Sequence, residues 1–140
     1  MNRNFKLAAA CFAAMLGMAV VSASEKAPED YVKAMKAIGD ANGKLRPLVT
    51  AKDYDGIATA AAGLKPNVAV AAKFWADKKV EDAAKLSSDV VKAVGDLEKA
   101  AKAKDDAGIA AAAGVIGGSC RTCHTAHRTE KLPDGSYEIK

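Results

Sequence analysis

Aromatic residues are scarce in this 140-residue chain, where Phe, Trp and Tyr make up 5% of the sequence and tryptophan occurs once. The chain also lacks a tract of clustered basic residues, although it contains 21 Lys and Arg. Nucleic-acid-binding proteins combine basic patches with aromatic side chains on which bases stack. We therefore expect no nucleic acid among its partners.

Alternating runs of β-branched and polar residues are also missing beyond the N-terminal segment. Such period-two runs are typical of β-strands, so an extended sheet is not expected. Alanine, lysine, aspartate and glutamate are plentiful instead, which is the composition of a helical protein. The sequence therefore predicts an all-α fold.

The N-terminus has the layout of a secretory signal peptide. Arg3 and Lys6 precede an apolar run over residues 7–21, and small residues follow it. We place cleavage after Ala23, with Ser24 as the alternative. A retained membrane anchor is disfavoured, because a transmembrane helix needs about 20 apolar residues, so no membrane span is expected after processing.

Three parts follow from this assignment: a signal peptide (1–23), a four-helix domain (24–128) and a C-terminal tail (129–140). Loss of the signal peptide reduces the 21 basic residues to 19, against 17 acidic residues, so the mature chain is nearly neutral. Cys11 would be lost with the signal peptide. The predicted location is the periplasm.

Apolar residues recur at helical spacings of three and four in three segments. The three stripes consist of Tyr31, Met35, Ile38, Asn42, Leu45 and Val49; of Ala83, Leu86, Val90, Val94, Leu97 and Ala101; and of Ile109, Ala113, Ile116, Cys120, Cys123 and His127. A shorter helix fits between Asp55 and Leu64, ended by the turn-forming residues 63–67, with a connection over residues 65–78. Short links make neighbouring helices antiparallel, so we predict an up-and-down four-helix bundle.

Two stretches of the chain echo each other: AKDYDGIATAAAGL (51–64) and AKDDAGIAAAAGVI (103–116). Each places an aspartate before a Gly-Ile-Ala run, which is typical of a helix start. Convergent use of the same helix-start residues explains the echo better than gene duplication. Pro28, followed by Glu29 and Asp30, likewise predicts the start of the first helix.

The stretch SCRTCHTAHR (119–128) contains the motif Cys-x-x-Cys-His. On a helix, Cys120, Cys123 and His124 emerge on one face, and here it is the apolar face. This motif is the attachment signature of c-type haem, in which two thiols add to the vinyl groups and the histidine binds the iron. We predict one haem c, attached through Cys120 and Cys123 and filling the space that small alanine side chains leave.

Three other interpretations of the motif are weaker. A disulfide between Cys120 and Cys123 would close almost no loop and would stabilise little. A thioredoxin-like redox pair needs a βαβ context, which the sequence lacks. A zinc site would draw on His124 and His127 as well, but four ligands within eight residues of one helix cannot easily surround a tetrahedral ion.

Two residues after the motif have open roles. His127 lies one turn from His124 on the same side of the helix, so we expect it to pack or to lie near a propionate rather than to bind iron. Arg128 lies four residues after His124. It either contacts a haem propionate or is a solvated arginine that suits the C-terminal end of the helix dipole.

Over residues 28–128 the chain resembles the class II c-type cytochromes, that is, cytochrome c′ and its low-spin, methionine-ligated relatives. The similar stretches are MKAIG in the first helix and FWADKKVEDAAKLSSDVVKAVGDLEKAAKAKDDAGIAAAAGVIGGSCRTCHTAHR. The resemblance places Phe74 and Trp75 at the opening of the third helix, where they either line the haem pocket or belong to the core.

The resemblance also implies that Met35 covers the other face of the haem. In the low-spin relatives this residue is the sixth iron ligand, whereas in cytochrome c′ it only packs. Two departures from the family bear on this choice. Tyr31 stands where the family usually has an arginine near a propionate. The connection over residues 65–74 is shorter, which favours closed coordination by Met35.

The resulting functional prediction is a mono-haem electron carrier that serves redox partner proteins and is not an enzyme, with His124 and Met35 as the iron ligands. The alternative is a five-coordinate protein of the cytochrome c′ kind that binds the small gases NO or CO. A peroxidase would need a distal acid–base residue, and the nearest polar candidate is Asn42. A homodimer through the first two helices is compatible with the resemblance.

The tail extends beyond the region of resemblance. Asp134 and Gly135 predict a turn. Two outcomes are open for the remainder: either Tyr137 and Ile139 fold back on the haem edge, or the terminus is frayed.

Overall fold

The structure is a computed structural model that describes residues 24–140; the predicted signal peptide, its cleavage site and Cys11 lie outside the described residues. The described residues form the helices α1 (Glu29–Ala51), α2 (Tyr54–Lys78), α3 (Glu81–Lys102) and α4 (Asp106–His127) and the short strands β1 (Glu25–Lys26) and β2 (Glu138–Ile139). Within residues 24–140, no helix is long and apolar enough to span a membrane.

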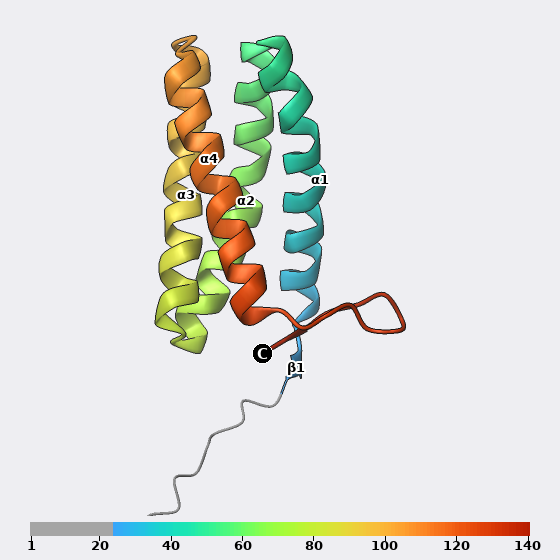
Figure 1. Ribbon diagram of the computed structural model, residues 1–140. Helices are drawn as coiled ribbons and strands as arrows, with labels where there is room; N and C mark the ends of the chain where they lie inside the picture. Colours follow the sequence, from blue (N-terminus) through green and yellow to red (C-terminus); the bar gives the residue numbers. More distant parts are fainter. Residues whose placement is uncertain (1–23) are drawn as a thin grey trace, which may run out of the picture.

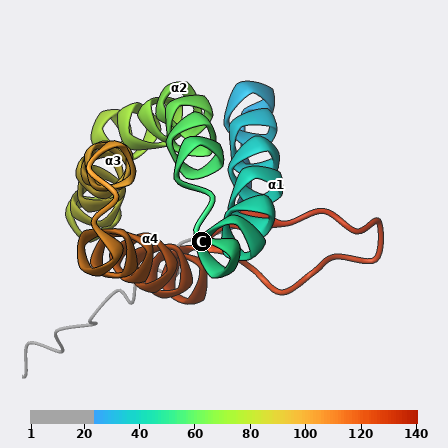
Figure 2. The same cartoon turned by 90° about the horizontal axis from the view of Figure 1, so that it is seen from above.

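The four helices of the described region run up and down in chain order, as predicted (Figure 1). Viewed along their axes, they are arranged around a common centre in the order α1, α2, α3, α4 (Figure 2). Each helix packs along the next one in the chain, whereas α1 and α4, both fully described, do not pack closely against each other. The prediction of an antiparallel four-helix bundle is confirmed, and the bundle has one loosely packed seam between its first and last helices.

Capping aspartates begin two of the helices, as the echoed sequences predict. Asp53 Oδ1 accepts a hydrogen bond from the Gly56 amide at 2.9 Å, and Asp105 Oδ1 accepts one from the Gly108 amide at 3.0 Å. A methyl group at either glycine would clash with the capping carboxylate, which explains the shared Asp-x-x-Gly spacing. Pro28 immediately precedes α1, in agreement with its predicted start.

The second helix is much longer than the sequence predicts. A helix ending near Leu64 and a connection over residues 65–78 were expected, but α2 continues through Pro66 to Lys78. Its buried residues step by four, three and four from Leu64, with Val68, Ala71 and Trp75 completing the stripe. Proline inside a helix removes a hydrogen bond and crowds the preceding turn. Burial of this stripe against the other helices outweighs that local cost.

Two expectations based on the shorter helix are therefore wrong. Phe74 and Trp75 lie in the last turns of α2 and do not open the third helix. Residues 65–74 are helical, so the shorter connection proposed there does not exist and gives no support to closed coordination. The actual link between α2 and α3 consists of Lys79 and Val80.

The core is rich in alanine and contains few large side chains. The largest fully buried ones are Trp75, Ile57, Leu64, Leu97, Ile116 and Val94. Most residues of the three predicted stripes face this core. Asn42 differs because it is exposed, whereas the other stripe residues are buried or half-buried.

The C-terminal tail folds back and pairs with the other end of the described chain. β2 runs antiparallel to β1, with Glu25 opposite Ile139 and Lys26 opposite Glu138, and Ile139 is only 6% exposed. In Figure 1 the segment between α4 and β2 projects past α1 as a loop before it returns. The tail thus links the end of α4 to the start of α1, across the loosely packed seam.

Replacing Ile139 with alanine is expected to lower the free energy of unfolding by about 2 kcal/mol, because a buried isoleucine loses most of its side chain. Urea denaturation followed by circular dichroism measures this change. Tyr137→Ala is the control, since Tyr137 is 38% exposed and mainly contacts Arg128; it should cost about 0.5 kcal/mol. Equal costs for the two variants would show that β2 does not contribute to the core.

Candidate functional site

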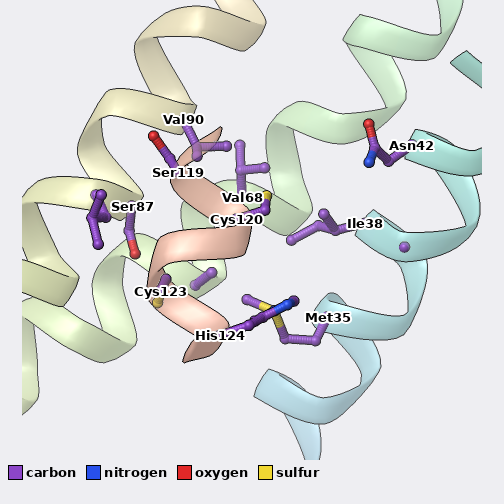
Figure 3. A pocket seen from close by; sticks show the side chains of 13 residues that line it. Met35, Ile38, Asn42, Val68, Ser87, Val90, Ser119, Cys120, Cys123 and His124 are labelled. Carbon is purple, nitrogen blue, oxygen red and sulfur yellow. The ribbon is translucent and has the colours of Figure 1, made fainter. Parts of the chain in front are cut away.

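One pocket of the bundle is lined by residues from all four helices. Its volume is about 120 Å³, not counting the space at its opening. Ile38, Val68 and Val90 contribute apolar walls from α1, α2 and α3 (Figure 3). The pocket is therefore a mainly apolar space inside the bundle, to which every helix contributes.

The wall that α4 contributes contains the Cys-x-x-Cys-His motif. Cys120, Cys123 and His124 all line the pocket, and all three side chains are half-buried. The spacing of three and four residues brings them to one helix face. The structure therefore brings these three predicted site residues together.

The opposite wall, from α1, contains Met35. This side chain is half-buried and lines the same pocket. Figure 3 shows Met35 and His124 pointing toward each other from α1 and α4. These are the two helices that do not pack closely. A thioether and an imidazole thus face each other across the seam of the bundle.

Burial shifts the protonation equilibria of the motif toward the neutral forms. It raises the pKa of the Cys120 thiol, and it raises the pKa of Cys123 to about 11 with smaller contributions from the charges of Cys120 and Asp82. Burial, followed by the positive charge of Arg128, lowers the pKa of His124. At neutral pH both thiols are protonated, and the imidazole is neutral with a lone pair free to bind a metal.

One known protein family matches the sequence of this chain. The family model described as Cytochrome C' matches residues 4–128, which is most of the chain. The chain belongs to the Cytochrome C' family. No curated protein and no solved structure matches it. The resemblance to class II c-type cytochromes is confirmed, and the tail after residue 128 lies outside the matched region.

Members of the Cytochrome C' family carry covalently bound haem c, so this protein is a haem-binding cytochrome. The residues of the pocket fit that group. Two thiols three residues apart and an adjacent neutral imidazole line one wall, and the remaining walls are mainly apolar. The donor set of Cys120, Cys123 and His124 is the one that c-type haem requires.

The other interpretations of the cysteine pair gain no support from the geometry. No disulfide joins Cys120 and Cys123. A redox-active pair needs a lowered thiol pKa, and here both are raised. Within residues 24–140, no three His, Cys, Asp or Glu side chains come together in a way that could hold a metal ion, as a zinc site would require.

His127 packs away from the pocket of this cytochrome. Its Nε2 atom lies 2.8 Å from Asp82 Oδ2, and its ring centroid lies 5.2 Å from that of Trp75. It does not line the pocket. The contacts of His127 in the structure are packing contacts, and its proximity to a propionate stays a prediction.

Arg128 directly follows α4 as its C-terminal cap and does not line the pocket. Its amide donates a hydrogen bond to the His124 carbonyl at 3.2 Å, and its guanidinium lies 4.1 Å from the centre of the Tyr137 ring. The propionate contact stays a prediction, and it would compete with this cation–π contact. Tyr137 and Ile139 are also absent from the pocket lining. Ile139 pairs with β1, so the tail is not frayed there, and its contact with the haem edge stays a prediction.

Sequence reasoning missed the contribution of α2 to the site. Val68 and Ala71 line the pocket, but residues 65–78 were expected to be a connection. It also missed that Trp75 Nε1 donates a hydrogen bond to Tyr31 Oη at 3.1 Å. The repeat of apolar residues from Leu64 to Trp75 at helical spacing could have revealed this half of the helix.

Proposed function

We propose that this protein is an exported mono-haem electron carrier. Cys120 and Cys123 hold the haem covalently, and His124 and Met35 are its two axial ligands. The observation that supports this most strongly is the opposition of Met35 and His124 across an apolar pocket that also contains both thiols. Haem c, when bound, supplies a one-electron ferric–ferrous couple.

Each pocket residue has a defined part in this proposal. The thiols of Cys120 and Cys123 fix the position of the haem relative to α4, so that His124 ligates almost intramolecularly. Met35 supplies a soft thioether, which raises the reduction potential above that of a bis-histidine site. Retention of both ligands in the two oxidation states keeps structural rearrangement small. The apolar walls exclude water from the pocket.

The direction of Met35 is the one that an electron carrier with two axial ligands requires. Its side chain points into the pocket toward His124, where it would close the position that NO or CO needs. Asn42, the nearest polar candidate for acid–base chemistry, is exposed at the pocket rim. Among residues 24–140, the side chains that line the pocket with Met35 include no Asp, Glu, Lys or Arg, and the role we propose is electron transfer between partner proteins.

Export to the periplasm agrees with this function. Haem attachment needs reduced thiols outside the cytoplasm, and the first 23 residues have the composition of a signal peptide. Mass spectrometry of the protein expressed with its maturation machinery should give a chain that begins at Ser24 and carries one haem. A redox partner and a homodimer through α1 and α2 belong to the same proposal.

Absorption spectra of the purified protein, oxidised and reduced, with and without CO, test the proposal. We expect a six-coordinate, low-spin spectrum in both oxidation states and little reaction with CO. A high-spin ferric spectrum and immediate CO binding would instead support the gas-binding alternative, with Met35 as a packing residue. Absence of any covalent haem would contradict both functions.

A further inference from the structure

One side chain from each helix meets at the end of the bundle where α4 ends. Trp75 of α2 donates a hydrogen bond from Nε1 to Oη of Tyr31 on α1, at 3.1 Å. The Trp75 ring lies 5.2 Å from the His127 ring of α4, and His127 Nε2 lies 2.8 Å from Oδ2 of Asp82 on α3. We call these four residues the aromatic brace.

The centre of the aromatic brace is buried. Trp75 is 2% exposed and Tyr31 is 8% exposed, and their rings meet edge to face with centroids 6.1 Å apart. Burial is the main cause that raises the pKa of Tyr31 to about 12, so its hydroxyl keeps its proton at neutral pH. Removing this hydroxyl would leave the buried Trp75 N–H without its partner, which is costly.

The aromatic brace lies one helical turn from the proposed iron ligands. Tyr31 precedes Met35 by four residues on α1, and His127 follows His124 by three residues on α4. One turn of helix is about 5.4 Å along the axis. Because helices are stiff over this distance, the separation of α1 and α4 at the brace carries over to Met35 and His124.

No close packing between α1 and α4 fixes that separation within the described part of the chain. Trp75 contacts both Tyr31 and His127, so the two helices rest on a common side chain. We propose that the aromatic brace positions Met35 opposite His124 and determines how firmly Met35 closes its side of the pocket. Tyr31 and Trp75 are thus positioning residues, and this inference rests on the proposed function of the pocket.

A Tyr31→Phe substitution in the haem-loaded protein tests the inference. It keeps the ring and removes only the hydroxyl that accepts from Trp75. We expect a roughly tenfold faster association of CO with the reduced protein, because the lost buried hydrogen bond loosens Met35 by about that factor. A high-spin component should also appear in the ferric absorption spectrum. Stopped-flow mixing with CO and absorption spectroscopy measure both changes.

Tyr54→Phe is the matched control. Tyr54 Oη donates a hydrogen bond to Asp106 Oδ1 at 3.0 Å, and it joins α2 to α4 at the opposite end of the bundle. This variant loses an interhelical hydroxyl far from the pocket, so its CO association and spectrum should equal those of the wild type. An equal acceleration in both variants would overturn the inference, because general loosening would then explain it.

A second variant tests whether the effect passes through the hydrogen bond. Trp75→Phe removes the donor, so Tyr31→Phe added to it should accelerate CO binding no further. Fully independent effects of the two substitutions would overturn this route. Wild-type kinetics in Tyr31→Phe would overturn the positioning role itself.

Different measurements test the proposed function and the aromatic brace. A high-spin wild-type spectrum would show that Met35 is not a ligand and would end the electron-carrier proposal. Met35 would still line the pocket opposite His124, and Tyr31→Phe would still be expected to speed CO access. The wild-type spectrum therefore tests the function, and the ratio of CO rates between variant and wild type tests the aromatic brace.

Discussion

A Met35→Leu variant should lose its six-coordinate, low-spin spectrum completely and bind CO as fast as an open haem. Leucine nearly preserves the volume and apolar character of methionine, so packing in the half-buried position is retained. The thioether sulfur is lost, and no other pocket residue of α1 carries a metal-binding group of comparable strength. The reduction potential should fall, because methionine ligation raises it. Absorption spectra and a redox titration measure both effects.

Ile38→Val provides the control for Met35→Leu. Ile38 follows Met35 by three residues, lines the same wall and is 8% exposed. This substitution disturbs packing at a cost of about 1 kcal/mol but removes no sulfur, so the spectrum should stay low-spin. A Met35→Leu protein that stays low-spin would show that another group is the sixth ligand. The assignment of Met35 would then be wrong.

The haem motif could be predicted from the sequence because its geometry is local. The positions of Cys120, Cys123 and His124 on one helix face follow from the helical repeat alone. The starts of α2 and α4 are local in the same way, since each aspartate caps an amide three residues ahead. Met35 was placed by resemblance together with its phase on the first apolar stripe, and the structure brings it to the same pocket.

The length of α2 could not be read from local preferences. Gly63 and Pro66 both indicate a helix end, yet the helix continues because its stripe is buried by neighbours that are distant in sequence. Tertiary packing commonly overrides such weak local terms. The regular spacing of apolar residues from Leu64 to Trp75 favours the longer helix, although Pro66 alone indicates a helix end.

The contacts at the end of the bundle are also long-range. Trp75 reaches a tyrosine 44 residues away, and β2 pairs with a strand more than a hundred residues earlier in the chain. Short strands and single aromatic residues have no periodic pattern that predicts their partners. The sequence therefore allowed us to predict that Met35 lies near the Cys-x-x-Cys-His motif, whereas the contacts among Tyr31, Trp75 and His127 became visible only in the structure.

Replacing both Cys120 and Cys123 with serine should abolish covalent haem. A serine hydroxyl does not add to a vinyl group as a thiol does, while its size disturbs the pocket wall little. The denatured variant, produced with the maturation machinery, should show by mass spectrometry only the mass of the polypeptide. Each single variant should keep one of the two bonds and show the shifted absorption of a haem with one unreacted vinyl group.

Ser119→Ala is the control for the cysteine variants, because Ser119 precedes the motif on α4 and lines the pocket without a thiol; its haem content should equal that of the wild type. The double variant should also unfold at lower denaturant concentration, since its alanine-rich core would lose the covalently bound group that lies in the pocket. Covalent haem that persists in the double variant would show attachment at another residue. In that case the haem would not be fixed beside His124 on α4, and the argument that Met35 lies on its other side would fail.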